Sequence, residues 1–204
     1  MEKFIYVKKK GMTSYISEDG TVSGVTVLEY QKTFVIHGAH ENDSDFTGVV
    51  VGNTELKENK VKSSVAGFFK KHGVAALKHT ESIPLKFETE DGKTQLGIEQ
   101  FVVGDTVNVS GKSIGRGFTG TIKRHNFRRG PKTHGSKSYR QPGSIGGGTT
   151  PGRVLPGKKM AGQSGNINVT ISNLEIVMID NEKGLLFIIG SVPGKKDNIL
   201  KLYR

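Results

Sequence analysis

Apolar and β-branched residues come in short runs along the first fifty positions of the chain, and polar residues that favour turns separate them. Asp19-Gly20 and Asn42-Asp43-Ser44 are two of these separators. Short runs broken by such residues are typical of hairpins in an antiparallel sheet or barrel. The pattern therefore predicts strands at residues 4–7, 15–16, 25–30, 34–37 and 48–51.

The period becomes helical over residues 63–77. Val65, Phe68 and Phe69 alternate there with basic positions, Ser64 is a suitable N-cap and Gly73 a suitable stop. This predicts one short helix. A second helix is predicted over residues 117–127, because Phe118 and Ile122 would share a face.

Strand patterns return at residues 85–88 and 101–110 and again at 169–179 and 185–189, where the last two are joined by a convincing hairpin turn. Strands therefore stand on both sides of the central segment. We expect a mainly β protein: an antiparallel β-barrel body of residues 1–110 and 166–204, with a small helical part near 63–77. A long arm, residues 111–165, is inserted into this body.

The predicted arm carries nearly all of the excess charge of the chain. The formal net charge is +11, and residues 111–165 hold 12 Lys or Arg, 14 Gly and no Asp or Glu, so the remainder has a net charge of −1. A glycine-rich cationic segment repels itself and buries little apolar surface, so we expect it to be extended when free. A polyanion that neutralises it is the best explanation of its composition.

Several classes of protein are disfavoured by composition. With no cysteine, a disulfide framework or a thiolate metal site is impossible. Only four apolar residues precede Lys8, which does not resemble a secretory signal, and no window approaches the roughly 18 apolar residues of a membrane span. The arm lacks the apolar face of a membrane-binding helix, so nucleic acid is the better polyanion, and we expect an intracellular protein without a membrane partner.

Two glycine motifs suggest phosphate chemistry, and both are incomplete. Residues 115–120 match G-x-G-x-x-G, but no acidic residue occurs from position 106 to 174 to hold a ribose. Residues 152–158 have P-loop spacing, but Lys159 stands where Ser or Thr should reach magnesium. Residues 37–41 could be imagined as a metal cluster, although a solvated loop fits better. We expect no enzyme activity, no cofactor and no metal.

A single lysine or arginine is usually a solvated surface charge. That interpretation fails for the arm as a whole, because a solvated surface would carry acids among its bases. His125, His134 and Tyr139 lie between the cations and could stack on bases.

At these residues the chain resembles the ribosomal protein L3 family in its bacterial form. The family signature is matched at Phe101, Asn108, Gly111, Ser113, Gly115, Arg116, Gly117, Gly120 and Arg124. Further similar segments are residues 9–13, 123–128, 133–135, 142–146, 150–154, 157–163 and 192–194. The resemblance covers the whole chain, weakly from about His37 to Leu85.

The resemblance implies a structural constituent of the large ribosomal subunit, in the cytoplasm or an organelle. Such a protein binds large-subunit rRNA, helps to start assembly, contacts neighbouring large-subunit proteins and is not a homo-oligomer. The rRNA-binding residues would be Lys112, Arg116, Lys123, Arg124, Arg128, Arg129, Lys132, His134, Lys137, Arg140, Arg153, Lys158 and Lys159. The tip of the arm, near the peptidyl-transferase centre, would be Gly143, Ser144, Gly146, Gly147, Gly148, Thr149, Thr150, Pro151 and Gly152.

The chain departs from the family pattern at the tip and beside it. His125 stands where many bacterial members have Trp, and Thr149 stands where several carry a glutamine that is methylated in some species. Gly147 and Gly148 replace polar residues. Two other functions stay open from sequence: a free-standing RNA-binding module or RNA chaperone, and a nucleotide-dependent enzyme that uses residues 115–120.

Overall fold

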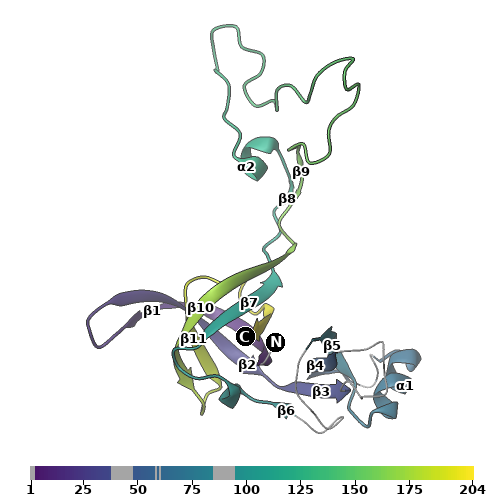
Figure 1. The fold of residues 1–204 in the computed structure, drawn as a ribbon, viewed down its shortest axis with the longest axis vertical. Coiled ribbons are helices and arrows are strands. Elements are labelled where there is room, and N and C mark those ends of the chain that lie inside the picture. The colour runs from purple at the N-terminus through teal and green to yellow at the C-terminus, as the bar shows by residue number, and fades with distance from the viewer. Residues whose placement is uncertain (1–2, 38–47, 58, 60, 85–94) are drawn as a thin grey trace. The chain divides into compact units, whose positions relative to one another are not determined.

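A computed structural model describes residues 3–37, 48–57, 59, 61–84 and 95–204 of the chain. The chain divides into two compact units. One, which we call the body unit, consists of residues Met1–Lys112 and Asn168–Arg204; the other, the inserted unit, is Ser113–Ile167. Figure 1 shows the elements of both.

The body unit contains a closed ring of six antiparallel strands (Figure 1). Around the ring the order is β1, β12, β7, β10, β11, β2 and back to β1. The strands are β1 (Phe4–Ile16), β2 (Val22–Gln31), β7 (Thr106–Lys112), β10 (Asn168–Asp180), β11 (Leu185–Ile189) and β12 (Ile199–Tyr203). The prediction of a mainly β protein is confirmed.

A second sheet of four strands follows the ring in the order β5, β4, β3, β6. Its strands are β3 (Thr33–His37), β4 (Val49–Glu55), β5 (Leu77–Ile83) and β6 (Gln95–Leu96). Helix α1 (Ser63–Lys71) connects β4 to β5, and a 3-10 turn, η2 (Ile98–Gln100), precedes β7. The strand predicted at 85–88, the turn at 42–44 and most of the 37–41 loop lie outside the described residues.

One apolar core joins the ring to the second sheet. Val35, Val51 and Ile83 belong to the same buried cluster as Ile176 and Leu202 of the ring. Burial of apolar surface on this scale is the main stabilising term in a domain of this size.

Strand β1 has an unusual burial pattern where the two sheets meet. Phe4, Ile5, Tyr6 and Val7 are all buried, although successive side chains of a strand point to opposite faces. The rings of Phe4 and Tyr6 pack edge to face with centroids 5.1 Å apart. The backbone N–H of Tyr6 donates to Thr33 Oγ1 at 3.0 Å. Both faces of this strand are therefore covered, which explains its continuous apolar run.

Strand β1 is longer than predicted, and β5, β6, β8, β9 and β12 were not predicted. The two runs at 4–7 and 15–16 belong to one strand, β1, with a bulge between Lys9 and Gly11. Residues 8–14, which are polar or glycine except for Met12, obscured it because the outer half of the strand is not buried. Strands β5 and β6 were missed because they contain few apolar residues, and β12 was missed although four of its five residues are apolar.

The first helix, predicted within residues 63–77 with its stop at Gly73, has about the predicted extent but starts differently. The predicted Ser64 cap is wrong: the N-cap residue is Lys62, without a side-chain hydrogen bond. The helix ends at Lys71, and Leu77 already belongs to β5. Gly73 is the stop, as predicted. It has φ +66°, and the N–H groups of Gly73 and Val74 donate to the carbonyls of Lys70 and Phe69, the pattern of a Schellman motif.

The predicted helix over residues 117–127 is wrong in its first half. Residues Gly117–Thr119 form strand β8, which pairs with β9 (Gly162–Ser164), and only Thr121–His125 are helical, as α2. Phe118 is therefore in a strand and does not share a helix face with Ile122. Residues 126–161 contain no helix or strand.

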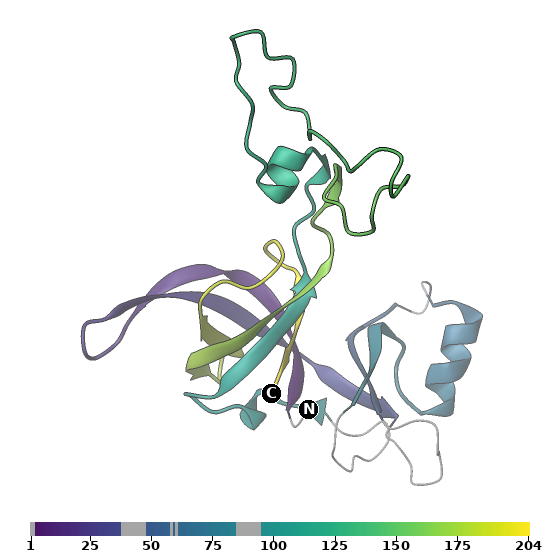
Figure 2. The same cartoon turned by 45° about the horizontal axis from the view of Figure 1, so that its top comes forward.

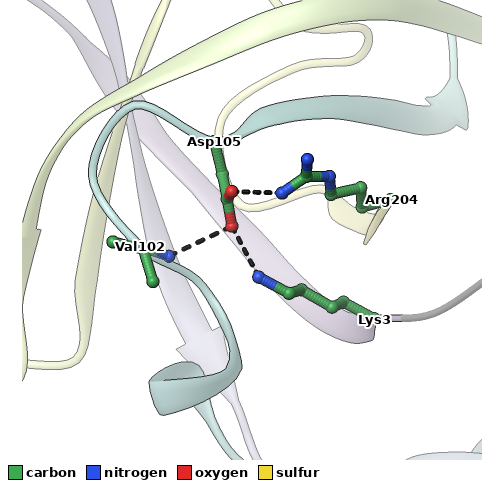
Figure 3. Close-up of polar contacts among 4 residues, drawn as sticks. All are labelled: Lys3, Val102, Asp105 and Arg204. Atoms are coloured by element: carbon green, nitrogen blue, oxygen red, sulfur yellow. Dashed lines mark hydrogen bonds and ion pairs between the residues drawn. The ribbon is translucent and has the colours of Figure 1, made fainter.

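Both chain ends of the body unit are held at Asp105, in the turn that precedes β7 (Figure 3). Lys3 Nζ lies 2.7 Å from Asp105 Oδ2, the Val102 N–H donates to the same oxygen at 3.2 Å, and Arg204 Nη1 pairs with Oδ1. The hydrogen bond from Lys3 is the largest of the effects that lower the pKa of the Asp105 carboxyl below its ordinary value. The carboxylate thus ties β1 and β12 to β7.

Among the described residues, no helix has both the length and the apolar character needed to cross a membrane.

Candidate nucleic-acid interface

The inserted unit begins and ends in a short antiparallel ribbon. Ser113 N–H donates to the Ile167 carbonyl at 2.9 Å, and Ile167 N–H donates to Ser113 Oγ at 3.3 Å. Arg116 N–H donates to the Ser164 carbonyl at 2.8 Å, and the β8–β9 pairs follow. The two strands of the ribbon therefore hold the ends of residues 120–161 together.

Arg124 connects helix α2 to the segment that leads into β9. Its Nη1 donates to the Met160 carbonyl at 2.8 Å, and His125 Nε2 lies 3.1 Å from the same oxygen. Gly162 makes room for the guanidinium, because a Cβ there would lie 2.7 Å from Arg124 Nη1. One predicted RNA-binding residue, Arg124, is thus used partly to hold the fold of the unit.

Gly165 permits a close backbone crossing in the ribbon. It has φ +68°, and a Cβ built on it would overlap the Ile114 carbonyl oxygen. Only glycine adopts this conformation without strain and leaves room for the opposing strand. Gly165 therefore allows the two strands of the ribbon that carries Arg116 and Phe118 to lie close together.

All eleven Lys and Arg residues of the inserted unit are exposed. No acid occurs in residues 113–167, so none of these cations has an ion-pair partner within the unit. The structure describes every residue of the unit. Among its cations, only Arg124 and Arg129 donate side-chain hydrogen bonds. Lys132 lies over the ring of Tyr139, and the other cations make no hydrogen bond or ion pair within the unit, as expected of groups that meet a polyanion.

Three of the predicted residues surround an exposed aromatic ring. Arg116, Lys123 and Arg140 line one pocket of about 330 Å³ with Phe118, which is 78% exposed. Thr119 also lines it, and its buried hydroxyl has no hydrogen-bond partner. A flat apolar ring among cations suits a nucleobase and its phosphates. Phe118 was not among the predicted site residues because a helix was predicted there. A prediction based on β-strand alternation would have placed its side chain on an exposed face.

A second aromatic ring is already engaged by cations of the unit. Arg129 Nη1 donates to the Tyr139 hydroxyl at 3.2 Å, and Lys132 Nζ lies 5.6 Å from the centre of the same ring. Gly130 N–H donates to the Tyr139 carbonyl at 3.0 Å. Tyr139, suggested from sequence as a stacking group, therefore orders two cations instead.

The predicted tip, residues 143–152, is exposed throughout and is built from turns. Ser144 Oγ donates to the Gly146 carbonyl at 3.1 Å, and Gly152 N–H donates to the Gly148 carbonyl at 3.2 Å. Gly143 and Gly152 have φ +77° and +67°. The bond from Thr150 to Pro151 is cis. The tip is thus a series of tight turns with few side chains.

The other predicted rRNA-binding residues of the unit lie on both sides of the tip. Arg128, His134 and Lys137 are on the segment that leads to it, and Arg153, Lys158 and Lys159 follow it. His134 has φ +59° and is exposed.

Lys112 differs from the rest because it ends β7 in the body unit. With Lys78, Lys201 and Asn198 it lines a groove of about 530 Å³. Lys201 there pairs with Glu81. The groove is therefore less cationic than the inserted unit.

The geometry does not favour either nucleotide motif. Gly117 starts a strand that pairs antiparallel with β9, whereas a dinucleotide site needs a parallel βαβ unit. Residues 152–158 are followed by no helix. The described residues contain no group of three or more His, Cys, Asp or Glu side chains that could hold a metal.

Part of the matched signature serves the fold of the body unit. Phe101 is buried, with Lys3 Nζ 5.8 Å from its ring centre. Asn108 Oδ1 accepts the N–H of Asn173 at a bulge of β10. A Cβ on Gly111 would overlap the side chain of Leu200. Arg116 and Gly117, by contrast, lie in the exposed ribbon of the inserted unit.

Comparison with known proteins agrees with the resemblance seen in the sequence. The model of the family described as Ribosomal protein L3 matches residues 2–185. Since this match spans most of the chain, the protein belongs to the ribosomal protein L3 family.

Individual relatives cover nearly the whole chain. Large ribosomal subunit protein uL3c of Phaeodactylum tricornutum is 43% identical over 195 residues, which is 95% of this chain and 94% of the relative. The uL3c of Porphyra purpurea is 44% identical, over 95% of each chain. The protein uL3 of Synechococcus sp. (strain RCC307) is 39% identical, over 96% of this chain and 91% of the relative.

Proposed function

We propose that this protein is a structural constituent of the large ribosomal subunit that binds large-subunit rRNA through its inserted unit. One observation carries the proposal: eleven exposed Lys and Arg residues and no acid in the 55 residues 113–167. Such a charge distribution is unfavourable by itself and is neutralised when phosphates replace small counterions. Membership in the ribosomal protein L3 family, a structural component of the ribosome, supports the same conclusion.

The two units have different roles in this proposal. The closed ring serves as a β-barrel body that stays at the surface of the subunit, where RNA surrounds it on one side only. The inserted unit serves as the arm that penetrates the RNA. The charge map supports this division, because residues outside the 111–165 segment have a net charge of only −1.

The pocket around Phe118 adds a second kind of contact. A nucleobase stacked on the ring would place its neighbouring phosphates within reach of Arg116, Lys123 and Arg140, which line the same pocket. Stacking on an aromatic side chain is worth about 1–3 kcal/mol per base. An unpaired base of the rRNA is the ligand that fits.

The tip, residues 143–152, would reach toward the peptidyl-transferase centre. Its turns expose backbone and leave little side-chain bulk at Gly146, Gly147 and Gly148, which suits a passage between RNA helices. Peptide-bond chemistry would belong to the RNA. The protein would shape its surroundings and help to nucleate early assembly.

Sedimentation tests the proposed function. We expect a tagged copy of the full chain, expressed in cells, to occur at one copy per large subunit and to remain there after a wash at moderate salt. A free-standing RNA-binding module or RNA chaperone would sediment mainly in light fractions and in substoichiometric amounts. Nucleotide-dependent hydrolysis by the purified chain would favour the enzyme alternative.

A further inference from the structure

The hairpin of β1 and β2 extends beyond the ring (Figures 1 and 2). Strand β12 pairs with β1 only from Phe4 to Lys8, and β11 pairs with β2 only from Glu29 to Val25. From Gly11 to Ile16 and from Val22 to Ser23, the described residues provide no further strand on the outer edges. The end of the hairpin therefore lacks lateral support from the ring.

One face of this hairpin end is apolar and open. Ile16 is paired with Val22, and Met12 lies on the same face because side chains alternate along β1. These three side chains are 67%, 65% and 54% exposed. Between them lie the cross-strand partners Ser14 and Gly24, which are small and exposed. The larger apolar side chains therefore lie at the two ends of this face, with the small residues between them.

The charge of the hairpin is opposite to that of the inserted unit. Residues 11–31 contain Glu18, Asp19 and Glu29 and no Lys or Arg. Glu29 pairs with Lys10 at 2.9 Å, whereas Glu18 and Asp19 stand in the exposed turn. Phosphate groups would be repelled by Glu18 and Asp19, and residues 11–31 supply no cation to neutralise them.

We propose that this face, Met12, Ser14, Ile16, Val22 and Gly24 with the acidic turn beside it, is a docking site for a basic segment of a neighbouring protein. The occupant has aliphatic side chains that cover Ile16 and Val22, and Lys or Arg side chains that reach Glu18 and Asp19. Apolar contact stabilises the complex, and charge complementarity selects against RNA. The proposal rests on the proposed function, since the neighbour is a component of the same subunit.

Site-specific photocross-linking in assembled large subunits tests this docking site. A benzophenone amino acid replaces Ile16 in one full-length variant and Thr13 in a control. Thr13 is exposed on the opposite face of the same strand. The Ile16 variant is expected to cross-link to one protein, at a peptide that contains Lys or Arg, and at least fivefold more than the control. Cross-links to rRNA, equal yields from both positions, or no protein cross-link at Ile16 would each overturn the proposal.

A binding measurement with the cross-linked protein completes the test. The substitutions Ile16→Ser and Val22→Ser remove apolar surface that is already two-thirds exposed, so folding should be little affected. The affinity of the purified full chain for that protein is expected to fall about tenfold. Unchanged affinity overturns the docking site. Absence of the wild-type chain from large subunits would instead contradict the proposed function, so the two failures are distinguishable.

Discussion

The guanidinium of Arg124 donates a hydrogen bond to the Met160 carbonyl at 2.8 Å, across 36 residues of sequence. This bond and the β8–β9 pairs are what hold the two ends of the 126–161 segment near each other. An arginine of the proposed RNA-binding segment thus has a structural role in the free protein.

Replacing Arg124 with Ala should therefore loosen the inserted unit in the free protein. The hydrogen bond is exposed, so we expect a loss of about 1 kcal/mol of local stability. Limited trypsin cleavage within residues 126–161 should become roughly fivefold faster, while the melting temperature of the body unit stays unchanged. Lys123→Ala is the matched control, since it removes an exposed cation without a side-chain hydrogen bond and leaves the trypsin sites within residues 126–161 unchanged. Equal effects of the two substitutions would contradict this role.

Two glycines of the inserted unit should respond very differently to alanine. Gly165 has φ +68°, and its Cβ would overlap the Ile114 carbonyl, whereas a Cβ on Gly148 meets nothing within 4 Å. Gly165→Ala should cost about 1–3 kcal/mol and disrupt the ribbon. Gly148→Ala should be neutral. Amide hydrogen exchange at Arg116 and Ile167 measures the effect, and protection preserved in Gly165→Ala would contradict the geometry.

Phe118→Leu should weaken RNA binding without changing its dependence on salt. Leucine keeps apolar bulk but loses the stacking face, so we expect roughly a tenfold higher Kd for large-subunit rRNA. The slope of log K against log salt should be the same, because no charge changes. Phe118→Tyr keeps the ring and should bind nearly as well as the wild type. A Leu variant with wild-type affinity would exclude a stacked base at this pocket.

The ion pairs at Asp105 should make the body unit sensitive to acid. Lys3 has the largest effect in lowering the pKa of this carboxyl in the folded state, and Arg204 lowers it further. The ionised carboxyl therefore stabilises the folded state above the unfolded pKa of about 3.9, and this stabilisation is lost as pH falls through the folded pKa. Asp105→Asn should lower the urea midpoint at pH 7 and flatten its decline below pH 4. Glu182→Gln, at an exposed turn, is the control. An unchanged acid-side profile would contradict the assignment.

Sequence patterns predicted the body unit well where apolar and β-branched runs are bounded by turn residues, as in β10, β11 and the turn between them. They failed where the environment is set by distant parts of the chain. The strand at residues 4–7 was predicted, but its burial on both faces depends on the second sheet that covers it. Strand β12 was missed although four of its five residues are apolar.

The candidate site, too, could be predicted from the sequence only in part. The concentration of cations and glycines in residues 111–165 is a property of composition, so it is visible without coordinates. That Phe118 stands exposed among Arg116, Lys123 and Arg140 depends on β8 pairing with β9, in which Phe118 is opposite Gln163, 45 residues further along the chain. The roles of Arg124 and Tyr139 in ordering the unit also depend on contacts that a local sequence pattern does not reveal.

The most direct test of RNA binding by phosphate neutralisation is the affinity of the full chain for large-subunit rRNA, measured over a range of salt concentrations. If about 6 to 8 of the cations contact phosphate, log K should fall against log salt with a slope of roughly −4 to −7. Replacing Arg128, Arg129 and Lys132 with Ser should reduce the slope by about 2 to 3 and leave the melting temperature unchanged. A wild-type slope near zero would contradict the account.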